Sequence, residues 1–530
     1  MLVNTIKQYQ AFILVLLLAI GLRITGITFD SLWLDESYQS LAEAYAEKLP
    51  DLTCLNGDYI LIKHRQVSDY NTLIKNFRVV DPLCPPLYAV ILNTWINYFG
   101  GSDLSVRLLS LVFSIIGIIT LFGLGILLFN YPIALLASLL MAISPFDIAY
   151  AQEARMYTLT FLLSSLSGGL FFVLIKSIIL KSADVKIKIL YLLTFVLATV
   201  ALINTHYTNL LFVAFEIFYV LYVVVRYKNK ELFYYFCVSG LLMLLTWLPW
   251  FNLFLEALRA PHHVFYVVRK ATFWWPIYAL LVRLPLNFIL FLSGKKIILP
   301  CILLYGSAAV ILLFSLKGLF VKGLKHTEID SFISQKLKWL TVEYLWLWLL
   351  TPSFLLWGLD LVKNQKLIEI SRYSYAIAPS VFILAGLGLY NLSRFNLQLY
   401  KTVILIQSVF CLINTSYTHL IPQKEPWCSV ANDLNKYNRE DYLVFVSQFY
   451  DIVCLDRYLT RSYRQIGLSP AMEAKQIENI FIKLKPVKFI LITAHEGEAI
   501  KNMLPPGFKM TRQIDYFHGL HLREYRVLTK

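Results

Sequence analysis

Long apolar segments follow one another from the N-terminus to about residue 420, and they limit what the chain can fold into more than any other feature. Most of them reach or approach the roughly 20 residues that a helix needs to cross a hydrocarbon core of about 30 Å. Only 15% of the 530 residues are charged, whereas soluble domains carry about 25%. These features exclude a disordered chain, a collagen-like chain and an ordinary cytosolic enzyme. We therefore expect a polytopic α-helical membrane protein.

The apolar segments predict about eleven membrane-spanning helices. The first covers residues 1–27 and is interpreted as an uncleaved span, because no convincing small-residue cleavage site follows it. The others lie in a multi-span membrane domain at residues 85–419, with spans expected at 103–129, 131–147, 155–178, 187–204, 207–226, 231–254, 297–316, 340–361, 371–391 and 398–419. The apolar segment 271–293 is expected to be interfacial or re-entrant, since a full span there would reverse everything after it.

The distribution of basic residues predicts how the chain is oriented. Lysines and arginines concentrate in loops that the span count places on one side, such as 176–188, 226–230 and 317–338. Because such loops face the cytoplasm, we expect the N-terminus inside and the C-terminus outside a plasma or inner membrane. These loops also account for the net charge of +15. No stretch interleaves aromatic and basic residues as base-stacking proteins do, so no nucleic-acid partner is expected.

Two parts of the chain are expected outside the membrane. The extracytoplasmic loop at residues 28–84 carries nine acidic residues against five basic ones. Residues 420–530 differ from the membrane part in their pattern of apolar residues. Apolar and polar residues alternate as in strands in DYLVFVSQF and KFILITA, and AMEAKQIENIFIKL has helical spacing. The last residues indicate a hairpin around His518–Gly519. We expect a small extracytoplasmic α/β domain of about 110 residues there.

The strongest local signal for chemistry is the pair Asp35–Glu36, which follows Trp33 just after the first expected span. Two adjacent carboxylates at a membrane–water boundary are well placed to act on a lipid-borne substrate, with one of them as general base. The pair could also begin an exposed helix, because negative charge is favoured in a first helical turn. On spacing alone, the helix start is the more common explanation.

A second signal ends the same loop, where Asp81 precedes Pro82, Pro85 and Pro86. These prolines fix the backbone and discourage a helix from starting before Pro86. They would hold Asp81 near the membrane surface, where it is a further catalytic candidate. A simple rigid turn that enters a helix would explain the same residues.

A third signal spans the expected connection between residues 147 and 155. Glu153, Arg155 and Tyr157 lie there, shortly after Ser144-Pro145-Phe146-Asp147. Charges at a span boundary must be solvated, paired or functional, because they are costly in hydrocarbon. The planar guanidinium of Arg155 could bind a phosphate. An ion pair of Glu153 and Arg155 that orients two helices would explain them equally well.

Weaker candidates fall at other span boundaries. His206 and Tyr207 lie at one, where a lone histidine is more often a satisfied interface residue than a catalyst. Arg372 and Tyr373 open a later span, and Arg372 could simply extend its charge to the interface. Glu216 lies in the middle of a span, where an ionisable residue is a functional candidate by default, although a buried structural hydrogen bond would also explain it.

The span count places Asp35, Asp81, Glu153, Arg155, His206 and Arg372 at the same outer face. Such convergence suggests one pocket that opens to the outer leaflet. The seven cysteines show no CxxC pair and no metal-ligand spacing, and no carboxylate cluster indicates an open coordination site. We expect no cofactor; a divalent metal is possible but not indicated. Cys54 and Cys84 both lie in the outer loop, where a disulfide could link them.

The order of these motifs resembles a known family. The matching residues are Asp35-Glu36, Asp81, Pro85-Pro86-Leu87-Tyr88, Trp95, Phe99-Gly100, Arg107-Leu108-Leu109-Ser110, Ser144-Pro145-Phe146, Gln152-Glu153-Ala154-Arg155-Met156-Tyr157, Thr205-His206-Tyr207, Arg372-Tyr373 and Glu425-Pro426-Trp427. From about residue 20 to 430 the chain is similar to the GT-C membrane glycosyltransferases. It looks closest to the family 39-like branch, which is related to protein mannosyltransferases and lipid A aminoarabinose transferases.

The resemblance implies a sugar on a polyprenyl phosphate as donor, and Asp35 as general base towards an acceptor hydroxyl, with inversion. Glu36 would neighbour Asp35 in the site, and Arg155 and Arg372 would be candidates for the donor phosphate. The remaining substrate-binding candidates are Glu153, Tyr157, His206, Tyr207, Tyr373 and Arg107. Relatives often have His-Pro-Pro where this chain has Cys84-Pro85-Pro86, so a role tied to that histidine is not carried over.

Two other functions remain as alternatives. A lipid-linked oligosaccharide polymerase or ligase would share the outer site but use a longer, diphosphate-linked donor. A secondary transporter or flippase is less well supported, because the two halves show neither an internal repeat nor broken spans at matched positions. The partners expected for the main hypothesis are the lipid-linked donor, membrane lipids, and a lipid, glycan or protein acceptor.

Overall fold

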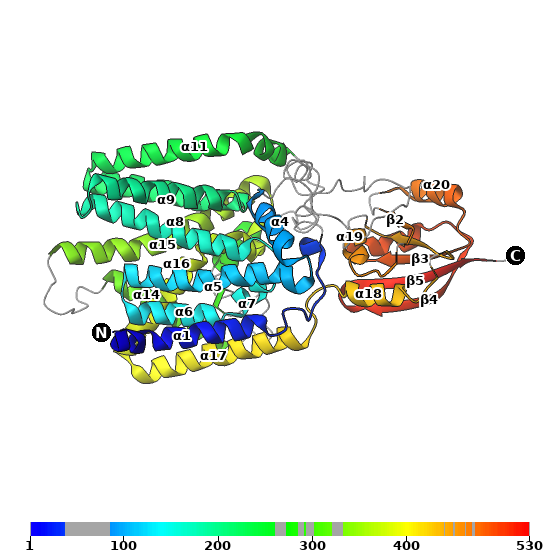
Figure 1. The fold of residues 1–530 in the computed structure, drawn as a ribbon, viewed down its shortest axis with the longest axis horizontal. Coiled ribbons are helices and arrows are strands. Elements are labelled where there is room, and N and C mark those ends of the chain that lie inside the picture. Colours follow the sequence, from blue (N-terminus) through cyan, green and yellow to red (C-terminus); the bar gives the residue numbers. More distant parts are fainter. Residues whose placement is uncertain are drawn as a thin grey trace. The chain divides into compact units, whose positions relative to one another are not determined.

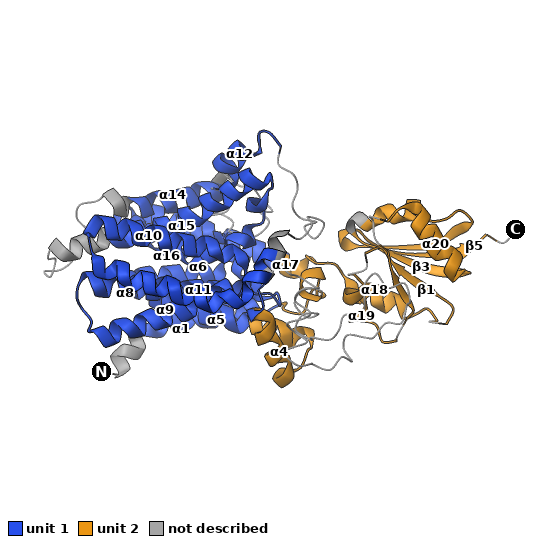
Figure 2. Cartoon of the chain, turned by 90° about the horizontal axis from the view of Figure 1, so that it is seen from above, with its two compact units in different colours: residues 1–25, 82–87, 110–417 blue, residues 26–81, 88–109, 418–530 orange. Residues whose placement is uncertain are grey.

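The computed structural model describes residues 2–37, 85–259, 272–284, 291–292, 302–320, 332–438, 440–448, 451–461, 463–468 and 472–528. The chain divides into two compact units (Figure 2). Unit 1 comprises residues 1–25, 82–87 and 110–417, and unit 2 comprises residues 26–81, 88–109 and 418–530. Asp81, Cys54 and Cys84 lie outside the described residues, so nothing structural follows for them.

Unit 1 is a bundle of apolar helices (Figure 1). Its elements are α1 (Leu2–Ile24), most of α5 (Asp103–Leu128), α6 (Tyr131–Ile143), α7 (Pro145–Ala151), α8 (Tyr157–Ile179), α9 (Val185–Ile203), η3 (Tyr207–Asn209), α10 (Leu210–Tyr227), α11 (Lys230–Arg259), α12 (Trp275–Tyr278), η5 (Ala279–Arg283), α14 (Ile302–Phe320), α15 (Phe332–Lys363), η6 (Leu367–Glu369), η7 (Ser371–Ile377), α16 (Ala378–Phe395) and α17 (Leu397–Leu420). The polytopic α-helical architecture expected from the sequence is confirmed.

The described helices account for the expected spans. Eight are long and apolar enough to cross a membrane, and nine are if the bent pair α6–α7 counts as one. Two shorter apolar helices, Tyr9–Ile24 and Leu303–Leu316, correspond to the first span and to the span expected at 297–316. The chain is thus an integral membrane protein. In the segment 271–293, the described residues 272–284 form only the short α12 and the π-helix η5.

One expected span is interrupted. Residues 131–147 were expected to form a single helix, but α6 ends at Ile143 and α7 begins at Pro145, with a bend of 63°. Pro145 has no N–H to continue the ladder of α6. The Ser144 side chain instead accepts a hydrogen bond from the backbone N–H of Asp147 and so caps α7. The bend makes Asp147 part of a short helix whose side chains are mostly buried.

Small residues let the central helices of unit 1 approach each other. Nearly all of α16 is buried, and it packs against α6 and α14. A side-chain carbon added at Gly388 would collide with the backbone oxygen of Ile311 in α14. One added at Gly386 would lie 2.7 Å from the backbone oxygen of Ile133 in α6. Close backbone contact of this kind favours glycine at helix interfaces in membranes.

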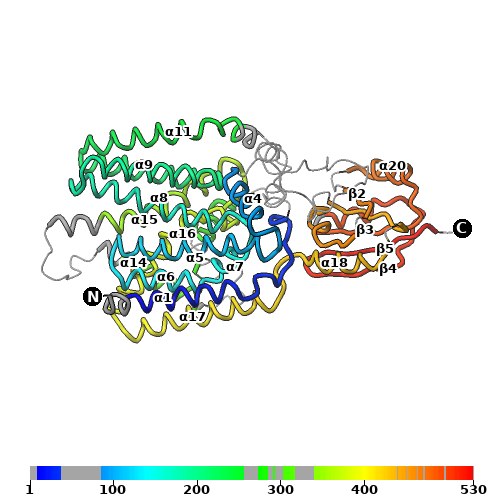
Figure 3. The backbone as a smooth tube through the Cα atoms, viewed as in Figure 1, coloured from blue at the N-terminus to red at the C-terminus, as the bar shows by residue number. Residues whose placement is uncertain are grey.

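Unit 2 contains a five-stranded sheet of order β2-β1-β3-β5-β4. The strands are β1 (Leu443–Val446), β2 (Gln465–Gly467), β3 (Lys488–Thr493), β4 (Phe508–Tyr516) and β5 (Leu520–Val527). β1 pairs in parallel with β2 and β3, whereas β5 is antiparallel to β3 and β4. The tube in Figure 3 follows the β4–β5 hairpin through η9 (Phe517–Gly519). Both predicted strand segments and the predicted hairpin are confirmed.

Helices α18 (Trp427–Leu434), α19 (Asp451–Asp456) and α20 (Ala474–Leu484) and the 3-10 segment η8 (His495–Met503) complete the C-terminal part of unit 2. Neighbouring residues of β1 point to opposite faces of the sheet. Val444 and Val446 accordingly join one apolar cluster, and Phe445 joins another that includes Phe481 of α20. Each sheet face therefore has its own core.

Two earlier segments also belong to unit 2: residues 26–37, and residues 88–109 with α4 (Leu87–Phe99) and the first turns of α5. α4 starts directly after Pro86, where the prolines allow a helix to begin. The Tyr458 hydroxyl accepts a hydrogen bond from the backbone N–H of Leu32 at 2.7 Å and donates one to Asp103 at 2.6 Å. The Arg457 guanidinium is ion-paired with Asp103. Three stretches distant in sequence thus form one unit.

Candidate functional site

Asp35 lies in a short helical turn in unit 2. The backbone N–H groups of Glu36 and Ser37 both donate to the carbonyl of Trp33 and close this turn. The preceding Leu34 packs against the apolar cluster on one face of the sheet. Asp35 is 8% exposed, so its carboxyl is largely shielded from solvent. Packing of the neighbouring side chains therefore fixes the position of Asp35.

The Glu36 carboxylate is fully buried and accepts hydrogen bonds through both oxygens. Arg107 donates from Nε to Oε1 at 2.9 Å and from Nη2 to Oε2 at 2.8 Å. Lys424 donates to Oε2 at 3.0 Å. Two parallel bonds from one guanidinium are a strong and directional arrangement.

All five N–H groups of Arg107 are engaged. Besides Glu36, its guanidinium donates to the backbone carbonyls of Ile27, Asp30 and Ser31. Arg107, which the sequence assigns to substrate binding, therefore ties the segment before Asp35 to α5. Glu36, expected as a catalytic neighbour, contributes to this link because it accepts two hydrogen bonds from Arg107.

Three carboxyl groups of unit 2 act electrostatically on the Cys454 thiol. Burial raises the pKa of the Cys454 thiol well above its usual range, and the negative charges of Asp451, Glu425 and Asp35 raise it further. Asp35, Glu425 and Asp451 are all buried. The motif Glu425-Pro426-Trp427 pointed to Glu425, but sequence analysis missed Asp451, which follows the carboxyl end of β1. Its position after a predicted strand was the available signal.

A cluster of arginine, tyrosine and histidine side chains forms in unit 1. The guanidinium carbons of Arg155 and Arg372 lie 5.8 Å and 5.9 Å from the centre of the Tyr157 ring. The His206 ring lies 6.5 Å from the Tyr157 ring and 5.2 Å from the Tyr373 ring, measured between ring centres. The structure thus brings together five candidates from three expected span boundaries. We call these five residues the Tyr157 cluster.

The Tyr157 cluster reaches the protein surface. Arg155 and Tyr157 are buried, whereas His206, Arg372 and Tyr373 are partly exposed. Ser110 of α5 donates a hydrogen bond to the backbone carbonyl of Arg155 at 3.2 Å and so holds the turn between α7 and α8. The cluster therefore combines a fixed inner part with an accessible outer part.

His206 is neutral within this cluster. Burial and the positive charges of Arg155 and Arg372 lower the pKa of His206 to about 3. The backbone N–H of Thr208 donates to Nδ1 at 3.2 Å. Nδ1 also lies 2.7 Å from the Thr208 hydroxyl oxygen. The contact with the backbone N–H favours Nδ1 as an acceptor, and we therefore assign the proton of the neutral ring to Nε2. His206 can donate one hydrogen bond from Nε2 without adding charge.

Two further candidates lie beside this cluster. Glu153 is buried in the turn between α7 and α8, where its carbonyl accepts from the backbone N–H of Arg155. The Tyr207 ring packs against Phe254 of α11, with 5.1 Å between ring centres. The Tyr207 ring therefore contacts α11.

Sequence analysis missed a buried network around Asp147. The Tyr375 hydroxyl donates to Asp147 Oδ1 at 2.6 Å. Arg23 of α1 is fully buried and donates to the carbonyls of Met141 and Ala142 and to the Ser114 hydroxyl. Arg23 interrupts an apolar segment, and that was the signal available in the sequence. Within the described ranges, no group of three or more His, Cys, Asp or Glu side chains is placed to hold a metal ion.

Comparisons with known proteins identify the fold. No protein-family model and no curated protein sequence matches the chain. Among solved structures, apo ArnT from Cupriavidus metallidurans is similar over 97% of both chains, with 12% identity and a TM-score of 0.59. ArnT bound to undecaprenyl phosphate covers 97% of this chain and 98% of its own, with 12% identity and a TM-score of 0.57.

A second protein shares the fold. The archaeal oligosaccharyltransferase AglB from Archaeoglobus fulgidus, in complex with an inhibitory peptide and a dolichol-phosphate, matches 92% of this chain. The match covers 70% of AglB, with 10% identity and a TM-score of 0.56. At these identities the similarity establishes the fold. The fold that the resemblance implied is confirmed.

Proposed function

We propose that a chain with this fold acts as an integral membrane glycosyltransferase, which moves a sugar from a polyprenyl-phosphate donor to a hydroxyl acceptor with inversion. The observation that carries the proposal is the Tyr157 cluster, where two guanidinium groups lie over one aromatic ring. The similar ArnT structure was solved with undecaprenyl phosphate, which supports a donor of this kind.

The Tyr157 cluster is assigned to the donor phosphate. Guanidinium groups match the oxygens of a phosphate with paired N–H donors. As the sugar leaves, negative charge develops on the phosphate, and Arg155 and Arg372 would stabilise it. The Nε2–H of neutral His206 would add a hydrogen bond. The partly exposed Arg372 and Tyr373 would give the donor access.

Asp35 is assigned to the acceptor. Its carboxylate would take the proton from the acceptor hydroxyl as the oxygen attacks the anomeric carbon. The bond from that carbon to the phosphate oxygen breaks, and the phosphate leaves with the electron pair. Attack opposite to the leaving group inverts the configuration. Glu36 and Arg107 would act as positioning residues, because their contacts hold the segment that carries Asp35.

We propose that the reaction proceeds without a metal ion. Both oxygens of Glu36 already accept hydrogen bonds from Arg107 and Lys424, so this carboxylate is engaged by protein cations. We expect that transfer continues unchanged after incubation with EDTA and removal of the chelator. Loss of transfer that added Mg²⁺ or Mn²⁺ restores would contradict this assignment.

We further infer that the reaction takes place at the outer face, with the N-terminus in the cytoplasm and residues 420–530 outside. The basic loops support this orientation. The acceptor is a hydroxyl on a lipid, a glycan or a protein. The oligosaccharyltransferase from Archaeoglobus fulgidus was also solved tethered with an acceptor peptide, which supports a protein acceptor among these classes.

The test is sugar transfer in membranes that contain the protein, supplied with a panel of labelled polyprenyl-phosphate sugars. We expect one donor to give a labelled product, and Asp35→Asn to lower the rate by roughly 10²–10⁴-fold, the usual contribution of a general base. The matched control is Asp441→Asn, which changes an exposed carboxyl of the C-terminal part and should leave the rate unchanged.

The other outcomes distinguish the alternatives. Transfer that survives in Asp35→Asn would move the general base to another carboxyl. Product formed only from diphosphate-linked oligosaccharides would support the polymerase or ligase function. Movement of lipid without covalent transfer would support a flippase. Arg155→Ala and Arg372→Ala should raise the KM for the donor more than the KM for the acceptor.

A further inference from the structure

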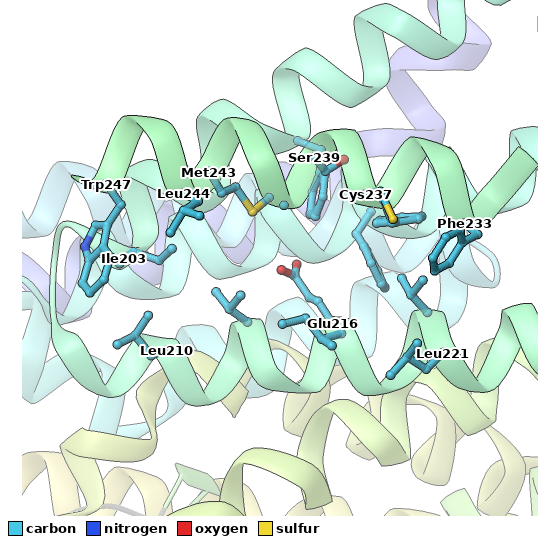
Figure 4. A pocket seen from close by; sticks show the side chains of 17 residues that line it. Ile203, Leu210, Glu216, Leu221, Phe233, Cys237, Ser239, Met243, Leu244 and Trp247 are labelled. Carbon is cyan, nitrogen blue, oxygen red and sulfur yellow. The ribbon is translucent and has the colours of Figure 1, made fainter. Parts of the chain in front are cut away.

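A pocket lies among α8, α9, α10 and α11 of unit 1, and the proposed reaction does not use it (Figure 4). Its volume is about 360 Å³, within the range of about 300–1,000 Å³ that ligand sites have. The lining is almost entirely apolar, with Phe171, Phe236, Met243 and Trp247 among the larger side chains. Among the described residues that line it, Glu216 of α10 is the one acidic side chain.

The Glu216 carboxyl is 3% exposed and points towards α11 (Figure 4). Its Oε1 accepts a hydrogen bond from the Ser167 hydroxyl at 2.8 Å, and Ser167 is in turn 2.7 Å from the Thr199 hydroxyl. Its Oε2 is buried and has no hydrogen-bond partner among the described residues. A buried oxygen without a partner is costly, so a ligand that supplies a hydrogen-bonding group would be favoured here.

The depth of Glu216 limits which ligands can reach it. The span that contains it covers Tyr207–Tyr227. At 1.5 Å per residue, Glu216 lies roughly 14–17 Å from either end, which places it near the centre of a hydrocarbon core of about 30 Å. Charged headgroups are strongly disfavoured at this depth. The ligand's polar group must therefore be neutral.

The pocket opens to the side of the bundle. Lining residues on both bordering helices have large exposed fractions, among them Ile217 with 57% and Leu221 with 47% on α10, and Leu244 with 52% on α11. In a membrane protein such apolar side chains face lipid. A ligand can thus enter directly from the bilayer.

We propose that this pocket binds a neutral membrane lipid whose polar group is a hydroxyl, which forms a hydrogen bond with Glu216 Oε2 while the hydrocarbon part fills the apolar lining. Diacylglycerols and long-chain or isoprenoid alcohols share this chemistry. The site is separate from the residues assigned to sugar transfer, so the proposal does not depend on that function.

The test uses the purified full-length chain in phosphatidylcholine nanodiscs. Three photoactivatable probes are compared: an isoprenoid alcohol, a diacylglycerol and a phosphatidylcholine, each with its reactive group in the hydrocarbon part. Labelled residues are mapped by mass spectrometry. We expect at least one hydroxyl probe to label residues that line the pocket on α10 and α11, and the same unlabelled lipid to compete with it. The two hydroxyl probes distinguish the two sources.

A glycine offers a way to fill the pocket without touching Glu216. Gly240 of α11 lines the pocket, and a side chain added there meets nothing within 4 Å. Gly240→Leu should therefore place its side chain in the cavity and abolish competable labelling. Gly123→Leu is the matched control, because Gly123 of α5 is also exposed, has equal open space and does not line the pocket.

Variants of Glu216 test the hydrogen bond. Glu216→Gln keeps a neutral group that can donate and accept hydrogen bonds and should retain labelling, whereas Glu216→Leu should reduce it about tenfold. The proposal is overturned if the phosphatidylcholine probe labels the pocket and is competed as well as the hydroxyl probes are. It is also overturned if Gly240→Leu, folded as judged by its melting curve, labels like the unmodified chain.

Discussion

The buried charges of Glu36 and Arg107 in unit 2 are hydrogen-bonded to each other. Glu36 is completely buried, and Arg107 is 1% exposed. Taking such ions out of water is expensive, and their attraction compensates only when the geometry is good and the remaining donors are satisfied. Both conditions hold here, because Arg107 bonds Glu36 twice and gives its other donors to backbone carbonyls. Removal of one partner would leave the other charge buried and unpaired.

We therefore predict that Glu36→Gln destabilises the protein by about 3–5 kcal/mol, the usual cost of breaking a buried ion pair. The measurement is thermal unfolding in detergent. The control is Lys436→Met, which removes the exposed pair with Asp433 and should cost less than about 1 kcal/mol. Equal changes of Tm in the two variants would contradict the structural role of Glu36.

His206 gives a pH dependence with a defined sign. Its pKa is about 3 in the folded protein and 6.5 in the reference state. Above pH 6.5 the ring is neutral in both states. As the pH falls from 6.5 towards 3, only the unfolded state takes up the proton, so His206 makes the folded state progressively less stable.

We predict that His206→Asn reduces the loss of stability between pH 6.5 and 4. Melting temperatures measured across this range are the test. His518→Asn serves as the control, because His518 lies exposed in the β4–β5 turn at a positive φ that asparagine also adopts. A slope that His206→Asn leaves unchanged would mean that other groups govern acid sensitivity.

At the scale of elements, Gly386 and Gly388 let α16 pack closely against α6 and α14. Gly388 faces the backbone of α14, whereas Gly358 of α15 has open space around it. We predict that Gly388→Ala costs about 1–3 kcal/mol through overpacking. Gly358→Ala should be neutral, or stabilising by up to about 1 kcal/mol, since alanine is the better helix former. Melting curves of the two variants compare them, and similar values would contradict close contact at Gly388.

Elements with a clear period could be predicted from the sequence. The strands at DYLVFVSQF and KFILITA alternate, and His518–Gly519 supplies the two positive-φ residues of a tight turn. The break between α6 and α7 was harder to predict, because Ser144 and Pro145 stand in a continuous apolar segment. A hydropathy profile shows how long an apolar segment is, but not the direction of its helix axis. It therefore cannot show the 63° bend between α6 and α7.

The candidate site was predictable to a different degree at each residue. Arg155, His206 and Arg372 are charged or polar residues at span boundaries. Span boundaries on the same side place residues at a similar depth relative to the membrane. Tyr157 was expected as a substrate-binding residue, but the sequence could not show that both guanidinium groups lie over its ring. The Asp147–Tyr375 contact joins residues 228 positions apart, and no local pattern encodes such a pairing.

For the whole molecule, the expected orientation puts unit 2 outside. Cys428 belongs to this unit and is exposed. We predict that a membrane-impermeant maleimide modifies it in intact cells, as read by mass spectrometry of the peptide that contains it. Burial and the charge of Asp103 raise the pKa of the Cys428 thiol, so labelling should become faster with rising pH. Modification only after permeabilisation would mean the opposite orientation.

The discontinuous make-up of unit 2 has a consequence for synthesis. Residues 88–109 leave the ribosome about three hundred residues before residue 418, and residues 26–37 about three hundred and eighty before it. At roughly 5–20 residues per second, these intervals are about 15–80 s. During it, Glu36 lacks Lys424, and Asp103 lacks Arg457 and Tyr458. Until the C-terminal stretch is synthesised, these carboxylates of the nascent chain remain without their partners. A chain truncated before residue 418 would lack the partners permanently.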